Sequence, residues 1–109
     1  VLLPADHGVG GRNQQTVLVA VNHVVEQLKW PANLLIASLG TDGEDGPTDS
    51  AGALADAAIA AKLRADRSAL RHAIARCDSL PLLERAGGLI RTGPTGTNVA
   101  DVRILLAGA

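Results

Sequence analysis

The chain has 109 residues, a formal net charge of −1 and a single cysteine, Cys77. This is the length of one domain, no basic clusters interleaved with aromatic residues point to nucleic acid, and one cysteine excludes an internal disulfide or a cysteine-based zinc site. Because no apolar run approaches the ~20 residues that span a membrane and no signal peptide is visible, we expect a cytoplasmic protein with neither membrane nor nucleic acid as partner.

The first part of the chain predicts a helix and a buried strand. Residues 1–3 resemble the end of a strand, and because the chain begins within it we expect a piece of a longer protein. After a glycine-rich loop, apolar residues recur at helical spacing over residues 16–29, with Asn13 as N-cap and Pro31 as the stop. Residues 34–39 form a short apolar run, which is typical of a strand covered on both faces.

The remainder predicts three helices and two short strands joined by a glycine-threonine loop. We expect Asp49 or Ser50 to cap the first of these helices. Because strands and helices alternate, the fold class is α/β, a single three-layer domain with a small mixed sheet flanked by helices. The expected elements are helices over residues 51–63, 67–76 and 79–86, strands over residues 89–91 and 102–107, and a loop over residues 92–98.

An acidic, glycine-rich loop follows the first predicted strand. Residues 40–52 contain four carboxylates, four glycines and a proline, and ordering such a loop is costly unless something offsets the charge repulsion and the lost backbone entropy. Asp42, Glu44, Asp45 and Asp49 offer the oxygen ligands that Mg²⁺ prefers, although their spacing is not that of an EF-hand. Alternatively, the aspartates brace the loop by accepting backbone hydrogen bonds, and the glycines admit another backbone or a ligand.

Two further loops carry groups that suit an anion. Arg12 follows a glycine-rich segment at the start of the first predicted helix, where a guanidinium and the helix dipole favour a carboxylate or phosphate; the alternative is a surface arginine. In residues 93–98, backbone N–H groups and two threonine hydroxyls favour an anion-binding turn, or else an ordinary tight turn. The Gly-Lys-Ser/Thr ending of a Walker A loop is missing.

Together, three motifs in the order of the chain carry a family resemblance. They are Gly10-Gly11-Arg12-Asn13-Gln14, the acidic loop from Gly40 to Asp49 followed by Ala51-Gly52-Ala53, and Gly93-Pro94-Thr95-Gly96-Thr97-Asn98-Val99 with Asp101. The chain resembles, over nearly its whole length, the MOFRL domain, the C-terminal domain of class II glycerate kinases, which are often called hydroxypyruvate reductases. It departs from the family pattern at Gln15, usually acidic, at Cys77 and Ala100, usually asparagine, and at Leu80, usually tyrosine.

The resemblance implies that the complete protein is an ATP-dependent glycerate kinase, which transfers the γ-phosphoryl group of ATP to a hydroxyl of glycerate with Mg²⁺. Residues 1–109 would be its C-terminal domain, and the active site would lie between this domain and a Rossmann-like N-terminal kinase domain. We therefore expect the isolated chain to be inactive, and a homo-oligomer is left open. Two alternatives remain: a non-catalytic bracing or docking module, and part of a hydroxypyruvate reductase, against which the lack of a Gly-x-Gly-x-x-Gly fingerprint counts.

The candidate site residues come from the three loops. Arg12 is the expected catalytic residue, because it matches a family arginine and its charge suits the glycerate carboxylate or a phosphate. Asp42, Asp45 and Asp49 are the expected metal ligands. The residues expected to bind substrate or phosphate are Asn13, Thr41, Asp42, Thr48, Thr95, Gly96, Thr97 and Asn98.

Overall fold

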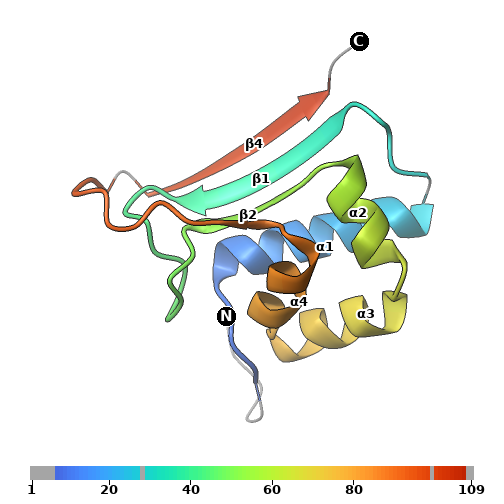
Figure 1. The fold of residues 1–109 in the computed structure, drawn as a ribbon, viewed down its shortest axis with the longest axis horizontal. Coiled ribbons are helices and arrows are strands. Elements are labelled where there is room, and N and C mark those ends of the chain that lie inside the picture. The colour runs from blue at the N-terminus through green and yellow to red at the C-terminus, as the bar shows by residue number, and fades with distance from the viewer. Residues whose placement is uncertain (1–6, 28, 99, 108–109) are drawn as a thin grey trace.

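The computed structural model describes residues 7–27, 29–98 and 100–107, in which four helices pack against a four-stranded sheet (Figure 1). The helices are α1 (Arg12–Gln27), α2 (Ala57–Arg64), α3 (Arg67–Arg76) and α4 (Ser79–Ala86), and the strands are β1 (Leu34–Gly40), β2 (Gly52–Ala55), β3 (Leu89–Ile90) and β4 (Asp101–Ala107). The sheet order is β3-β2-β1-β4. The α/β class is confirmed, whereas the strand predicted at residues 1–3 lies outside the described residues.

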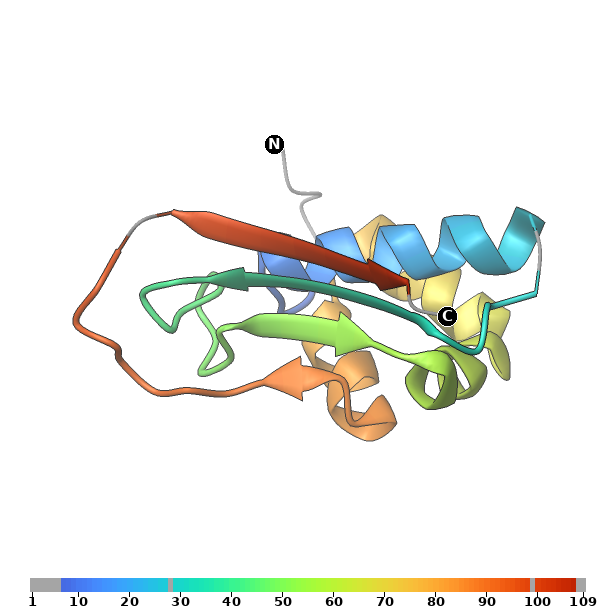
Figure 2. The ribbon, with the colours of Figure 1, turned by 90° about the horizontal axis from the view of Figure 1, so that it is seen from above.

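The sheet itself differs from the prediction, because it is antiparallel rather than mixed and the described helices cover one face rather than two (Figure 2). β2 follows β1 through the acidic loop, without the crossover helix that a parallel pair needs. On β4, Val102, Ile104 and Leu106 share the face opposite the helices and are 38%, 38% and 59% exposed. A continuous apolar run therefore did not signal a strand buried on both faces.

The helix predicted over residues 51–63 is instead a strand followed by a short helix. β2 pairs with β1 on one side and with β3 on the other, and Ala53 and Ala55 are fully buried in the core. Asp56 then caps α2 by accepting a hydrogen bond from the backbone N–H of Ile59 at 2.9 Å. Tertiary pairing thus overrides the high helix propensity of alanine, since small side chains allow α1 to pack closely on this strand.

The remaining elements agree with the sequence pattern. α3 has the predicted bounds, α4 ends at Gly87 in the left-handed conformation that favours glycine, and β1, β3 and β4 lie within a residue of their predicted ranges. Aliphatic side chains fill the core between the sheet and the helices. Those that are almost fully buried include Val17, Leu18, Val21, Leu63, Leu70 and Leu83. Among the described helices, none has the length and apolar character to cross a bilayer.

Candidate functional site

Asp45 of the acidic loop caps α1 from a distant part of the chain. Its carboxylate accepts hydrogen bonds from the backbone N–H groups of Asn13, at 2.9 Å, and Gln14, at 2.8 Å, and from Nδ2 of Asn13 at 3.2 Å. The first N–H groups of a helix have no partner within the helix, and this carboxylate supplies one. α1 therefore begins at Arg12, four residues before the predicted start, and Asn13 lies in its first turn rather than at the N-cap.

Two buried amide side chains extend this cap into a polar network. Asn13 Oδ1 accepts a hydrogen bond from the hydroxyl of Ser38 in β1. Gln14 donates to Thr48 Oγ1 at 3.1 Å, and its Oε1 accepts from the hydroxyl of Ser79 in α4 at 3.1 Å. Asn13 and Thr48, which we predicted to bind substrate, thus belong with Gln14 to a network that joins α1, β1, α4 and the acidic loop.

Glycines allow the three loops to touch one another. A Cβ atom on Gly11 would lie 2.3 Å from Asp45 Cγ, and one on Gly43 would lie 2.1 Å from the carbonyl oxygen of Gly93. Both distances are far below an ordinary carbon contact. The first loop therefore rests on the acidic loop, and the acidic loop rests on residues 93–98, so the close approach expected from the glycines is made by another backbone.

The third loop uses much of its hydrogen-bonding capacity within the protein. The hydroxyl of Thr95 donates to the carbonyl oxygen of Thr41 at 2.6 Å, and Thr95 Oγ1 accepts from the backbone N–H of Thr97 at 3.2 Å. Asn98 Oδ1 accepts from the backbone N–H of Ala100 at 3.1 Å. Gly96, between the two threonines, is exposed, and a Cβ there would meet nothing within 4 Å. The loop is thus braced on one side and open on the other.

Ala100 marks a strained point next to this loop, because its φ of +75° lies in the left-handed region that residues other than glycine, asparagine and aspartate avoid. Its carbonyl accepts hydrogen bonds from the backbone N–H and the hydroxyl of Thr41, which fix the conformation. Cys77 has a φ of +53° at the end of α3. Asparagine tolerates this conformation better than alanine or cysteine does, which gives a physical reason for the asparagine that the resemblance led us to expect at both positions.

We therefore expect Ala100→Asn to stabilise the chain by about 0.5–1 kcal/mol, since asparagine tolerates the left-handed conformation that costs alanine about 1–2 kcal/mol. The urea midpoint of unfolding measures the effect. Ala58→Asn, on the exposed face of α2, is the matched control and should destabilise by roughly 0.5 kcal/mol, because asparagine is a poorer helix former than alanine. Equal destabilisation by both substitutions would contradict the explanation.

An open concavity of about 500 Å³ lies beside the first loop and the acidic loop. The glycine-rich segment before α1, the first turns of α1, Gly46 and Pro47 of the acidic loop, and Arg103 of β4 form its walls. Arg12 and Arg103 are the arginines of the described lining. Its size is in the range of small-molecule sites, and its two guanidinium groups favour a negatively charged ligand.

Arg12 is held at the edge of this concavity by Asp101, the first residue of β4. Its Nε donates to Oδ2 of Asp101 at 2.5 Å and its Nη2 donates to Oδ1 at 2.9 Å. This paired hydrogen bond is the main cause that raises the pKa of Arg12 and lowers the pKa of Asp101, so both groups stay ionised. The side chain of Asn13 and then the charge of Arg12 lower the pKa of Asp101 further. The Arg12 side chain is 71% exposed, and Nη1 has no partner among the residues that the structure describes.

The sequence reasoning missed Arg103. It lies two positions after Asp101 on β4, so both side chains stand on the face of the sheet that carries α1. The signal that could have identified Arg103 is its spacing from Asp101. Residues two apart in a strand share a face, so Arg103 had to lie on the same side of the predicted strand as the motif residue Asp101.

The three aspartates predicted as metal ligands are not brought together. Asp45 caps α1, Asp42 Oδ1 accepts from the backbone N–H of Glu44 at 3.0 Å, and Asp49 pairs with Arg91 at 3.2 Å. Within residues 7–27, 29–98 and 100–107, no three histidine, cysteine, aspartate or glutamate side chains are grouped so as to hold a metal ion. Each of the three aspartates has a separate partner, which offsets the charge repulsion within the loop.

The family model and the curated relatives that match the chain point to the same family. The model of the MOFRL family matches residues 1–101. The chain is 41% identical over 98 residues to a D-glycerate 2-kinase of Thermotoga maritima, covering 90% of this chain and 22% of that protein, and 36% identical over 106 residues to a glycerate 2-kinase of Pyrococcus horikoshii, covering 97% and 23%. It is 38% identical to the human glycerate kinase, covering 90% and 19%.

Solved structures with the same fold agree with these relatives. The crystal structure of the Thermotoga maritima glycerate kinase matches with a TM-score of 0.83 at 39% identity, covering 99% of this chain and 25% of that one. A protein of Pyrococcus horikoshii matches with a TM-score of 0.85 at 36% identity, covering 98% and 23%. The chain thus spans about a fifth to a quarter of the length of the relatives it matches.

Proposed function

Because the chain belongs to the MOFRL family, we propose that it is the C-terminal domain of a glycerate kinase, which transfers the γ-phosphoryl group of ATP to a hydroxyl of glycerate. The attacking hydroxyl oxygen forms a bond to phosphorus, the bond from phosphorus to the bridging oxygen of ADP breaks, and the hydroxyl proton is released. Two relatives are named for position 2 of glycerate, so we assign the 2-hydroxyl as acceptor. The remaining chain of the kinase is the partner that completes the active site.

The observation that carries this proposal is the concavity beside the first loop and the acidic loop, which has Arg12 and Arg103 in its lining. Phosphoryl transfer asks the protein mainly to position its reactants and to neutralise charge on phosphate and carboxylate oxygens. Arg12, oriented by Asp101, presents Nη1 to such an oxygen. The exposed side of residues 93–98, with Gly96 at its tip, is the second surface that we assign to the nucleotide or glycerate.

Mg²⁺ accompanies ATP in this reaction, and when bound it supplies charge neutralisation on the phosphates. Asp42, Asp45 and Asp49 each have a separate partner, so the described acidic residues do not form a three-ligand site for it. Mg²⁺ is also bound through one or two carboxylates completed by substrate phosphates, so Asp42, Asp45 and Asp49 as metal ligands stay a prediction. Our predictions of a cytoplasmic location and of a homo-oligomer stay predictions.

The two alternatives left by the sequence are a hydroxypyruvate reductase and a non-catalytic bracing module. The named relatives reported above are glycerate kinases, and the reductase alternative is dropped. The bracing alternative describes the buried network around Asp45, which joins the loops, but it leaves the concavity and its arginines without a role. Bracing and binding therefore belong to different residues of the same loops.

Assay of the full-length protein tests the proposed function. We expect ADP to form only when glycerate, ATP and Mg²⁺ are all present, with 2-phosphoglycerate as the product. The isolated 109-residue chain should be inactive in the same assay. Oxidation of NAD(P)H with hydroxypyruvate, in place of ATP consumption, would overturn the proposal.

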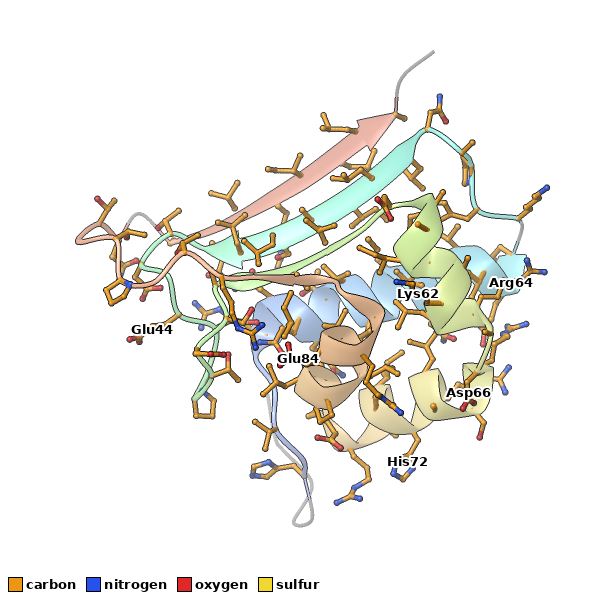
Figure 3. The ribbon with its side chains drawn as sticks, in the orientation of Figure 1. Glu44, Lys62, Arg64, Asp66, His72 and Glu84 are labelled. Carbon is orange, nitrogen blue, oxygen red and sulfur yellow. The ribbon has the colours of Figure 1, made fainter. Side chains whose placement is uncertain are left out.

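We expect Arg12→Ala in the full-length kinase to lower kcat/KM for glycerate by about 10- to 100-fold, because the variant loses a charged hydrogen-bond donor to the oxyanion. Steady-state kinetics measure the effect. Arg64→Ala is the control, because Arg64 is exposed at the end of α2, away from the acidic loop that carries Glu44 (Figure 3). If Arg12→Ala left both KM and kcat unaltered, Arg12 would be removed from the site.

A further inference from the structure

Arg103 lines the concavity with a guanidinium that is not engaged by a carboxylate of the described residues. No hydrogen bond or ion pair joins its guanidinium to any residue in the described part of the chain, whereas Arg12 and Arg91 both pair with carboxylates. Arg103 stands on the same face of β4 as Asp101, opposite Ser38 of β1, and it lines the concavity together with Arg12. An arginine fork with free donors is suited to bidentate recognition of a carboxylate or phosphate.

The other positive groups at the concavity are already engaged. The charge of Arg12 is largely balanced by Asp101, and the positive end of the α1 dipole is capped by the carboxylate of Asp45. The Arg12–Asp101 pair therefore contributes little net charge, and the capped helix contributes no free positive end. Of the two arginines in the lining, Arg103 is the one whose charge is not held in an ion pair within the described part of the chain, so it is the more available to an oxyanion.

Asp101 pairs with Arg12 and lies two positions before Arg103 on β4. Its pKa is lowered first by the hydrogen bond from Arg12 and also by the charges of Arg12 and Arg103. Because both carboxylate oxygens of Asp101 accept from Arg12, they are turned toward that arginine, and the guanidinium of Arg103 keeps its donors for a ligand.

We propose that Arg103 binds the oxyanion that enters this concavity, either the carboxylate of glycerate or a terminal phosphate of ATP, while Arg12 and Asp101 form a fixed pair beside it. This inference rests on the proposed function, and it goes beyond it by naming a binding residue outside the three loop motifs. The carboxylate of glycerate and the phosphate of ATP are both oxyanions, and kinetics in which each substrate is varied separately distinguish them.

The test is steady-state kinetics of the full-length kinase with Arg103→Gln, Arg103→Lys and the distant control Arg64→Gln. We expect Arg103→Gln to raise KM by about tenfold or more for one substrate: for glycerate if its carboxylate is bound, for ATP if its phosphate is bound. Arg103→Lys should recover part of the loss, since it restores the charge without the fork. Arg64→Gln should match the wild type.

The outcomes separate this inference from the proposed function. If the wild type phosphorylates glycerate and Arg103→Gln leaves both KM values within twofold, the inference is overturned and the proposed function stands. If the wild type consumes no ATP with glycerate, the proposed function fails, and calorimetric titration with inorganic phosphate decides the inference. Binding to the wild type that is lost in Arg103→Gln would then support it, and equal binding to both would overturn it.

Discussion

Replacing Asp45 by alanine is expected to destabilise the chain by at least about 3 kcal/mol. The carboxylate is 1% exposed and accepts three hydrogen bonds from the first turn of α1. Its removal leaves buried N–H donors of Asn13 and Gln14 unsatisfied, at about 1–3 kcal/mol for each group, and removes the helix cap as well. A domain with a typical stability of about 5–15 kcal/mol would lose a large share of it.

Urea unfolding of Asp45→Ala, Asp45→Asn and Asp49→Ala measures this effect. Asp45→Asn should fall between the wild type and Asp45→Ala, because an amide keeps the shape but offers one acceptor oxygen in place of two. Asp49 is the matched control in the same loop, and its exposed pair with Arg91 should contribute less than about 1 kcal/mol. An Asp45→Ala variant as stable as Asp49→Ala would show that the buried network does not hold the loops.

The second large effect is expected for Gly52→Ala, which should cost about 3 kcal/mol or more and lower the yield of folded protein. A Cβ atom at this position would lie 2.0 Å from the carbonyl oxygen of Ser38 in the neighbouring strand. β2 cannot move aside easily, since Gly52 pairs with Leu39 on one side and with Ile90 on the other. Overpacking of this kind typically costs about 1–3 kcal/mol, and more when only backbone can yield.

Gly96→Ala separates this steric effect from the loss of glycine flexibility. Gly96 has a φ of +74°, but a Cβ there would meet no atom within 4 Å. Its substitution should therefore cost about 1–2 kcal/mol, the conformational penalty alone. The midpoint temperatures of thermal unfolding of the two variants are compared. Equal midpoints for Gly52→Ala and Gly96→Ala would contradict the steric explanation for Gly52 at the junction of β1 and β2.

Local signals in the sequence predicted those elements whose ends are set locally. α3 and α4 follow aspartates at the N-cap positions, and Gly87 ends α4 in the left-handed conformation, so their bounds could be read from neighbouring residues. The start of α1 could not be predicted in this way, because its cap is Asp45, which lies 32 residues after Asn13 in the chain. β2 was missed because its alanines favour a helix in isolation, and only pairing with β1 makes them a strand.

In the candidate site, too, features that depend on neighbouring residues could be predicted, and features that depend on distant segments could not. The family resemblance identified the three loops, and the chemistry of arginine predicted Arg12 at their edge. The partners could not be derived from spacing, because the pairing of Arg12 with Asp101 and of Gln14 with Thr48 depends on how distant segments pack. The predicted metal site illustrates the limit: Asp42, Asp45 and Asp49 are close in sequence, but the fold directs each toward a different partner.

The central claim is that the concavity beside Arg12 and Arg103 belongs to the active site of a glycerate kinase. A crystal structure of the full-length protein with glycerate and a non-hydrolysable ATP analogue tests it most directly. We predict a carboxylate or phosphate oxygen within about 3 Å of a guanidinium nitrogen of Arg12 or Arg103, the distance of a charge-assisted hydrogen bond. A structure in which both ligands are bound and neither touches a residue lining the concavity would contradict the claim.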